Sequence, residues 1–375
     1  MRIGRGQMWG GPPGLRRAPW PAWLLLGALP AAAQGLLFVG TWPKQVQVID
    51  EAKQQVIDHI QLETGSPRAL VLSEDRKTLY VTTTDHNGIE VVDVATRKVT
   101  NSFVLDEGER RVRFNAWAPD PTGKLIYMVI RTAEKKIDRF EIEKQKFAVV
   151  DLAQKKIVRT ADIPPDEETR GGFGFMKISP DGKFMYLFRG TVLIFDTTDF
   201  KLTDTIDLSK PQFPGMAQVG FGGSLDSIQE PGKLVSLFNS SDPIVRRNIF
   251  GIARFDLTNR SFDFTPIGPS TGGMMGLFVT PDRKTGYTVT FNGNGGNRRC
   301  EFWVFDLTSN QLTRKQEFDG RARFSFGISS SGKDLYIYAA GYTVEIFDSA
   351  TLKLRNTIDL NADITTGMVV LPPTR

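Results

Sequence analysis

The chain has 375 residues, of which 40% are hydrophobic and 24% are charged, an ordinary composition for a folded globular protein. Its one cysteine, Cys300, excludes an intramolecular disulfide framework, a haem-attachment motif and a cysteine-rich zinc site. Its two histidines, His59 and His86, exclude a multi-histidine metal centre and argue against a histidine-based catalytic triad. We therefore expect neither a metal site nor a cofactor.

Residues 1–33 have the layout of a secretory signal peptide. Four arginines and no acidic residue precede an apolar stretch from Ala22 to Leu29, and small residues follow up to Ala33. The apolar stretch is shorter than the ~20 residues that span a bilayer. The pattern predicts cleavage after Ala33, a periplasmic or secreted location, and no stable membrane insertion after cleavage. An uncleaved N-terminal anchor is the alternative.

The net charge changes once this leader is set aside. Removing its four arginines lowers the net charge from +5 to +1. A charge so close to neutral does not favour nucleic-acid binding, so we expect no nucleic-acid partner.

Residues 34–375 carry one pattern seven times: a hydrophobic strand that ends in aspartate, a short polar turn, and a further strand. The aspartates are Asp50, Asp93, Asp151, Asp196, Asp256, Asp306 and Asp348. Because each lies in a different repeat, we expect each to accept hydrogen bonds from the backbone of its own turn. A Ca²⁺ site or a carboxylate dyad built from these aspartates is the alternative.

A second motif separates the copies and is clearest at Ser179-Pro180-Asp181-Gly182-Lys183, where Pro, Asp and Gly favour a tight turn. Residues 69–105 form the clearest unit, with strands expected at 69–73, 79–83, 89–94 and 99–105. Four short antiparallel strands in each of seven repeats predict an all-β fold. The expected architecture is a single seven-bladed β-propeller over residues 34–375.

The two ends of this region complement each other. Leu36 to Gly40 matches the second strand of a unit and has no first strand before it, whereas Thr365 to Leu371 has the pattern of a first strand without a unit. We predict that these strands pair in one blade, which closes the ring and leaves no free sheet edge.

The repeat resembles known propeller families. Leu79-Tyr80-Val81-Thr82, with Val91-Val92-Asp93 downstream, resembles the YVTN-type propeller repeat, and the likeness extends over residues 36–371. The chain is also similar to the seven-bladed β subunit of quinohemoprotein amine dehydrogenases, through the charged excursion between Val129-Ile130-Arg131 and Val149-Val150-Asp151. That resemblance implies a non-catalytic scaffold that holds a dihaem subunit and a small quinone-bearing subunit.

Strand direction predicts where the loops lie. If the strands of a blade are called a to d from the inside outwards, the a–b and c–d turns share one face. The b–c and d–a loops share the other face, called here the top face. A rigid scaffold commonly carries its function on such loops.

Arginines gather in the expected top-face loops, and their forked guanidinium groups suit carboxylates, phosphates or an acidic protein partner. The candidate binding residues are Arg246, Arg247, Arg298, Arg299, Arg321, Arg323 and His86. The alternative is a solvated rim in which acidic neighbours pair with the arginines; these neighbours are Glu107, Glu109, Glu167, Glu168 and Asp319.

Three functions remain open. The first is an exported, non-catalytic binding scaffold that takes a protein partner or a small anionic ligand on its top face. The second is the propeller subunit of a periplasmic quinoprotein amine dehydrogenase-type complex, with a haem or quinone subunit as its partner. The third is a lactonase-like hydrolase, which needs a metal or an acid–base group at the mouth of the channel. We expect the first, since no catalytic constellation is visible.

Overall fold

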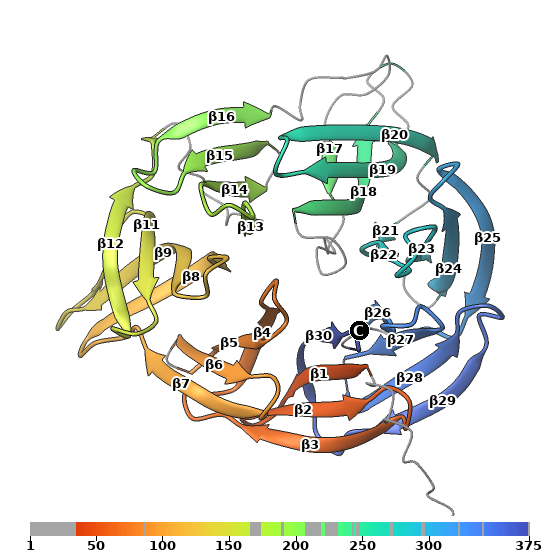
Figure 1. Ribbon diagram of the computed structural model, residues 1–375, viewed down its shortest axis with the longest axis horizontal. Coiled ribbons are helices and arrows are strands. Elements are labelled where there is room, and N and C mark those ends of the chain that lie inside the picture. The colour runs from red at the N-terminus through yellow and green to blue at the C-terminus, as the bar shows by residue number, and fades with distance from the viewer. Residues whose placement is uncertain are drawn as a thin grey trace, which may run out of the picture. The chain divides into compact units, whose positions relative to one another are not determined.

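The computed structural model describes residues 35–85, 87–165, 174–188, 191–206, 219–221, 232–241, 244, 248–269, 273–293, 297–321, 323–339 and 341–373. These residues form seven antiparallel sheets that stand around a common axis like the blades of a propeller (Figure 1). The predicted all-β, seven-bladed architecture is confirmed.

Each blade has four strands, a to d, from the axis outwards, and blade 6 has a divided inner strand. Blade 1 consists of β30 (Ile364–Leu371), β1 (Leu36–Thr41), β2 (Gln45–Asp50) and β3 (Gln55–Gln61). Blade 2 consists of β4 (Pro67–Leu72), β5 (Thr78–Thr83), β6 (Gly88–Asp93) and β7 (Lys98–Val104). Blade 3 consists of β8 (Arg110–Pro119), β9 (Leu125–Lys135), β11 (Lys146–Asp151) and β12 (Lys156–Asp162), with the additional strand β10 (Phe140–Ile142) beside β9.

The remaining blades follow in chain order. Blade 4 consists of β13 (Phe175–Ile178), β14 (Phe184–Phe188), β15 (Val192–Asp196) and β16 (Leu202–Ile206). Blade 5 consists of β17 (Val219–Phe221), β18 (Lys233–Ser241), β19 (Asn248–Asp256) and β20 (Ser261–Pro269). Blade 6 consists of β21 (Gly273–Met274), β22 (Phe278–Val279), β23 (Thr285–Asn292), β24 (Arg299–Asp306) and β25 (Gln311–Phe318). Blade 7 consists of β26 (Ser325–Ile328), β27 (Asp334–Tyr338), β28 (Thr343–Asp348) and β29 (Leu354–Asp359).

The ring closes in blade 1, where the first and last strands of the propeller pair. β1 and β30 are antiparallel, with Leu37 opposite Val370 and Phe38 opposite Val369. Figure 1 shows the two strands side by side. The predicted pairing of the terminal strands is thereby confirmed, and β1 has no open inner edge.

The hydrophobic core is divided among the seams between blades. Seven buried apolar clusters occur in the described residues, and each joins strands of two neighbouring blades. The cluster at the closing seam, for example, packs Tyr336 and Val344 of blade 7 against Leu37 and Ile49 of blade 1. The middle strands are covered on both faces, which explains why their sequences are continuous hydrophobic runs.

The seven repeated aspartates cap the c–d turns. Each accepts a hydrogen bond from a backbone N–H two or three residues further on, as Asp348 does from Thr351 at 2.7 Å. The residue four positions after each aspartate has a positive φ; these residues are Gln54, Arg97, Lys155, Phe200, Arg260, Asn310 and Leu352. The aspartates are therefore structural, as the sequence predicted.

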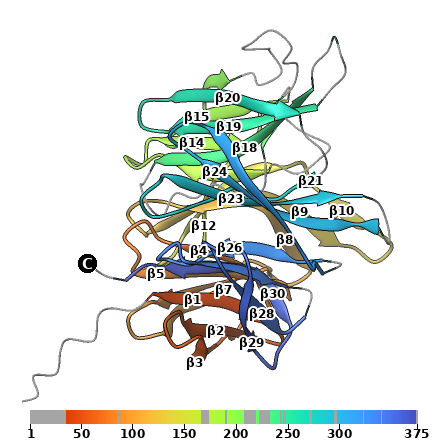
Figure 2. The same cartoon turned by 90° about the vertical axis from the view of Figure 1, so that its right-hand side faces the viewer.

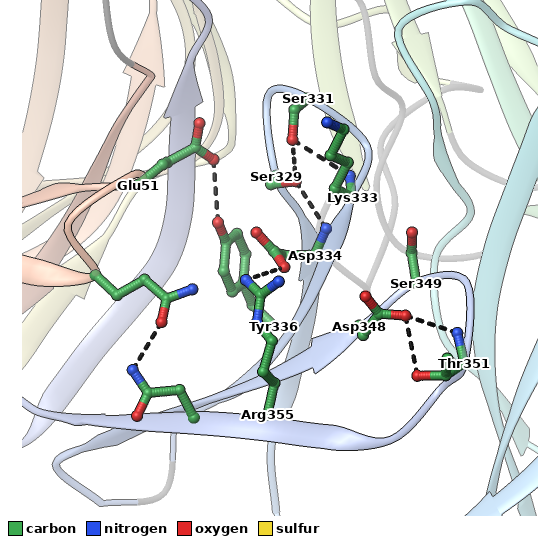
Figure 3. A network of polar contacts seen from close by, with 12 residues as sticks. Glu51, Ser329, Ser331, Lys333, Asp334, Tyr336, Asp348, Ser349, Thr351 and Arg355 are labelled. Carbon is green, nitrogen blue, oxygen red and sulfur yellow. Dashed lines mark hydrogen bonds and ion pairs between the residues drawn. The ribbon is translucent and has the colours of Figure 1, made fainter.

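A network of hydrogen bonds joins blade 7 to blade 1 on the face of the c–d turns (Figure 3). The carboxylate of Glu51 accepts hydrogen bonds from the backbone N–H of Ser330 at 2.9 Å and from the hydroxyl of Tyr336 at 3.1 Å. Burial raises the pKa of the Glu51 carboxyl, and these hydrogen bonds oppose the shift. Nearby, Arg355 forms an ion pair of 2.6 Å with Asp334.

Candidate functional site

The top face carries the b–c and d–a loops, because neighbouring strands of every blade run antiparallel. Figure 2 views the ring from the side, with β9 and β10 toward this face and the C-terminus toward the opposite face. The arginines proposed from the sequence belong to these loops and to the strand ends beside them.

Arg298 and Arg299 lie together at the top edge of blade 6. They border a shallow hollow of about 440 Å³ that also includes Cys300, Glu317 and Asp319. The guanidinium of Arg298 stands 4.0 Å from the centre of the Phe291 ring, and Arg299 forms an exposed ion pair of 3.0 Å with Glu317. An acid on the same edge thus already neutralises part of this basic pair.

Arg321 lies in the d–a loop between blades 6 and 7, and its side chain contacts the third strand of blade 7. Its guanidinium lies 2.9 Å from the carboxylate of Glu345 and donates a 2.7 Å hydrogen bond to the hydroxyl of Thr343. Both charged side chains are largely buried. Arg321 therefore has a structural role that the sequence did not indicate.

Of the other four candidate binding residues, the structure describes one. The side chain of Arg323 is exposed. Arg246, Arg247 and His86 lie outside the described residues. The binding role of all seven candidates stays a prediction.

The position of Glu345 in its strand recurs in other blades, and sequence reasoning missed it. Three residues before the repeated aspartate, blade 1 has Gln47 and blade 2 has Glu90. Gln47 donates to the backbone carbonyl of Leu360 at 2.9 Å, and Glu90 accepts from the backbone N–H groups of Glu63 and Thr64 at 2.8 and 2.7 Å. Each of these side chains holds the d–a loop of the preceding blade. A Gln or Glu three residues before the repeated aspartate is the signal that could have revealed them.

Large apolar side chains are exposed on the top-face loops, which sequence reasoning also missed. Trp42, Ile244 and Tyr342 lie in the b–c loops of blades 1, 5 and 7, with 60%, 84% and 52% of their surface exposed. Ile137 is fully exposed in the b–c excursion of blade 3. Single exposed apolar side chains are ordinary on a protein surface, so an interaction surface is indicated chiefly by Trp42 and Tyr342, which lie in adjacent blades.

Blade 3 extends this face into a three-stranded tongue, formed by the ends of β8 and β9 together with β10. β9 pairs with β8 from Arg110 onwards on one side, and with Phe140 to Ile142 of β10 on the other. The tongue stands out from the ring at the left of Figure 1. It corresponds to the charged excursion noted in the third repeat.

A second hollow, of about 220 Å³, lies on the opposite face among the ends of the inner strands of blades 2, 3 and 4. Glu74, Tyr80, Trp117 and Lys177 border it. Partial burial raises the pKa of Glu74, against the attraction of Lys177, and burial raises the pKa of Tyr80 to about 12. The hollow could hold a small polar molecule.

Within the described part of the chain, no three His, Cys, Asp or Glu side chains come close enough to hold a metal ion. Burial raises the pKa of the Cys300 thiol, which keeps it protonated and poorly nucleophilic.

The described residues contain no helix that is long and apolar enough to cross a membrane.

The seven antiparallel sheets define the class of this protein, a seven-bladed β-propeller. No family model and no curated protein matches the chain.

Among solved structures, the chain is similar to a functionally unknown protein from Desulfotomaculum acetoxidans, at 12% identity and a TM-score of 0.55, covering 91% of this chain and 100% of that one. It is also similar to a protein from Bacteroides fragilis provisionally assigned as a 6-phosphogluconolactonase, at 15% identity and a TM-score of 0.52, covering 90% and 98%. A third is the dihydro-heme d1 dehydrogenase NirN, at 13% identity and a TM-score of 0.50, covering 92% and 78%. At these identities the likeness concerns the fold alone.

Proposed function

We propose that this chain is an exported YVTN-type propeller that acts as a non-catalytic scaffold and binds a protein partner through its top face. The observation that carries the proposal is the set of exposed apolar side chains on the b–c loops, with Trp42 and Tyr342 in adjacent blades at the closing seam. Aromatic side chains of this kind are the usual anchors of protein interfaces. The leader of residues 1–33 supports a periplasmic or secreted location.

The tight packing between neighbouring blades also supports a scaffold function. The seams of the ring are fixed by apolar clusters and by polar links, such as Glu90 with Thr64, so the loops project from a rigid base. A preformed surface loses little conformational entropy on binding. At the edge of blade 6, Arg298 and Arg299 offer guanidinium groups to acidic side chains of a partner, in competition with the neighbouring Glu317 and Asp319.

Affinity capture with variants of the loops tests this function. The mature chain, residues 34–375, is immobilised, incubated with a periplasmic extract and compared with a Trp42→Ser/Tyr342→Ser variant. The matched control is Leu202→Ser/Leu354→Ser, which removes exposed apolar side chains from outer strands. We expect the first variant to lose at least about tenfold of the captured partner, as for interface anchors, and the control to retain it. Equal capture by all three proteins would refute a top-face scaffold.

A second candidate is the propeller subunit of a quinoprotein amine dehydrogenase-type complex. The tongue of blade 3 favours it, because the excursion on which that resemblance rests is an ordered part of the sheet. Haem absorbance in the captured material, together with a small quinone-bearing chain identified by mass, would support this candidate. A captured partner without haem would exclude it and leave the general scaffold.

A lactonase-like hydrolase is the third candidate, and Glu74 in the hollow of the opposite face is the residue to test. Lactone hydrolysis that is abolished by Glu74→Gln would favour an enzyme. Hydrolysis that this variant leaves unchanged would remove the hollow as an active site.

A further inference from the structure

We propose that one face of the blade 3 tongue is the docking surface for an acidic segment of a partner protein that also carries apolar side chains. The inference rests on the proposed scaffold function and narrows it to one surface and one partner chemistry. The register of the three strands, the charges on each face and the free edge of β10 support this surface.

Strand register determines which side chains share a face of the tongue. Arg111 lies opposite Ala133, Arg113 opposite Arg131, Phe140 opposite Lys135, and Ile142 opposite Ala133. Because directly opposite residues point to the same side of a sheet, one face is formed by Arg111, Arg113, Arg131, Ala133, Lys135, Phe140 and Ile142. This set is called the basic–apolar face. All of its members except the half-buried Ala133 are exposed.

The cations of this face are suited to an external anion. Arg113 and Arg131 are directly opposite each other, and like charges in this position destabilise a strand pair. No ion pair links either arginine to an acid within the described ranges, whereas Arg111 of the same face forms an ion pair of 3.6 Å with Asp106. A carboxylate placed between Arg113 and Arg131 would relieve their repulsion and accept forked hydrogen bonds from both.

Two large apolar side chains lie beside these cations. Phe140 and Ile142 are two residues apart in β10, so they share one side of the strand, and 64% and 65% of their surface is exposed. An exposed aromatic and aliphatic pair gains free energy when a partner covers it with apolar atoms. The face therefore favours a segment that presents both acidic and apolar groups.

The opposite face of the tongue has a different character. Glu134 and Glu141 lie opposite each other there, and each is neutralised within the hairpin: Glu134 by Lys136 at 2.6 Å and Glu141 by Arg139 at 2.7 Å. Glu134 and Glu141 therefore do not neutralise the basic–apolar face, on which Arg113, Arg131 and Lys135 form no ion pair with an acid in the described residues, while Arg111 is paired with Asp106.

The free edge of β10 favours a protein over a lipid surface. The hydrogen bonds from the N–H of Lys136 to the carbonyl of Arg139 and from the N–H of Glu143 to the carbonyl of Thr132 set the phase of the β9–β10 ladder. In an antiparallel ladder the bonded pairs alternate, so the backbone groups of Phe140 and Ile142 point away from β9. Unpaired backbone groups are costly in hydrocarbon but are readily satisfied by a polypeptide.

Binding of a defined peptide probe tests the inference. The probe is a fluorescent 12-residue peptide that alternates Glu with Leu and Phe, and the comparison peptide has Gln in place of every Glu. Fluorescence anisotropy with the chain 34–375 should show roughly tenfold tighter binding of the Glu peptide at low salt, and the preference should shrink as salt screens the charges. Vesicles with 30% anionic lipid are the second probe; binding to vesicles without binding to the Glu peptide would overturn the proposal.

Variants then assign the binding to this face. Arg113→Gln/Arg131→Gln should weaken the Glu peptide about tenfold, while the thermal midpoint stays equal or rises because the arginines repel each other. Phe140→Ser/Ile142→Ser should weaken both peptides. Glu134→Gln/Glu141→Gln, on the opposite face, should leave binding of the Glu peptide intact. Unchanged peptide binding in the arginine variant would refute the docking surface.

The outcome is separable from that of the general scaffold. The Trp42→Ser/Tyr342→Ser variant should still bind the Glu peptide, because its changes lie in blades 1 and 7. If the native partner is lost with Trp42 and Tyr342 but retained by the arginine variant, the scaffold function stands and the tongue is not its docking surface.

Discussion

The guanidinium of Arg321 lies 2.9 Å from the carboxylate of Glu345 and ties the d–a loop after blade 6 to the third strand of blade 7. The same strand position is used by Gln47 and Glu90 to hold the d–a loops before blades 1 and 2. Polar side chains at one repeated position thus fix three of the d–a loops, those before blades 1, 2 and 7, to the blade that follows.

The Arg321–Glu345 pair should contribute measurably to stability. Both side chains are largely buried, so Arg321→Ala leaves a carboxylate without its partner and should lower the free energy of unfolding by about 1–2 kcal/mol. The exposed pair of Arg299 with Glu317 is the control, and Arg299→Ala should change it by less than about 0.5 kcal/mol. Denaturant unfolding measures both values; equal effects would contradict a role of Arg321 in the seam.

Glu51 should make the closing seam sensitive to pH. Its carboxyl has a raised pKa in the folded chain, chiefly through burial, so the folded state binds a proton that the unfolded state has already released. Stability should therefore fall as the pH rises from the ordinary pKa of 4.5 through the folded-state value. Thermal midpoints of the wild type and Glu51→Gln are compared between about pH 4 and pH 7. The midpoint of the wild type should fall relative to that of Glu51→Gln as the pH rises, because Gln cannot ionise. A constant difference between the two curves would argue against this ionisation.

Removal of the last strand should open the ring. A chain that ends at Asp363 lacks β30, so Leu37 and Phe38 lose the partners Val370 and Val369 and the inner edge of β1 is exposed. β30 has five apolar side chains, and all are partly buried, so at about 1 kcal/mol each, below the ~1.5–3 kcal/mol of full burial, their loss should cost about 5 kcal/mol. The control ends at Leu371, keeps β30, and should unfold as the full chain does. Circular dichroism and size-exclusion chromatography would detect the unfolding and the association through the open edge.

Gly251 in β19 should tolerate no side chain. A Cβ atom there would lie 2.1 Å from the backbone carbonyl oxygen of Thr265 and 2.5 Å from the ring of Phe238. Gly251→Ala should therefore destabilise blade 5 by about 2–4 kcal/mol, because the backbone of β20 must move. Gly268→Ala is the matched control in the neighbouring strand, where the nearest atom is 4.0 Å away. Similar unfolding midpoints for the two variants would show that β20 yields more easily than its packing implies.

Much of the fold could be predicted from local signals. The strands expected at 69–73, 79–83, 89–94 and 99–105 correspond to β4, β5, β6 and β7 within two residues at each end. The aspartate at the end of each third strand caps its turn as expected, because capping depends on backbone groups only two or three residues away. The blade closure also followed from the sequence, since two unmatched strand patterns stood at opposite ends of one repeat series.

The candidate site was less predictable, because its properties depend on contacts between blades. The sequence placed Arg321 among the binding candidates, and only the structure shows its carboxylate partner, 24 positions away in another blade. Similarly, Trp42 and Tyr342 are 300 positions apart in the chain and become neighbours in the ring through the pairing of β1 with β30.

The sequence by itself determined the repeat, the turn chemistry and the closure of the ring, because hydrophobic alternation and turn residues act over a few positions of the chain. The tertiary structure decided which charges are neutralised and which apolar side chains stay exposed, because both depend on what the neighbouring blade presents across a seam. The opposed pair of Arg113 and Arg131 illustrates the difference: each is an ordinary surface arginine in the sequence, and only the register of β8 with β9 sets them against each other.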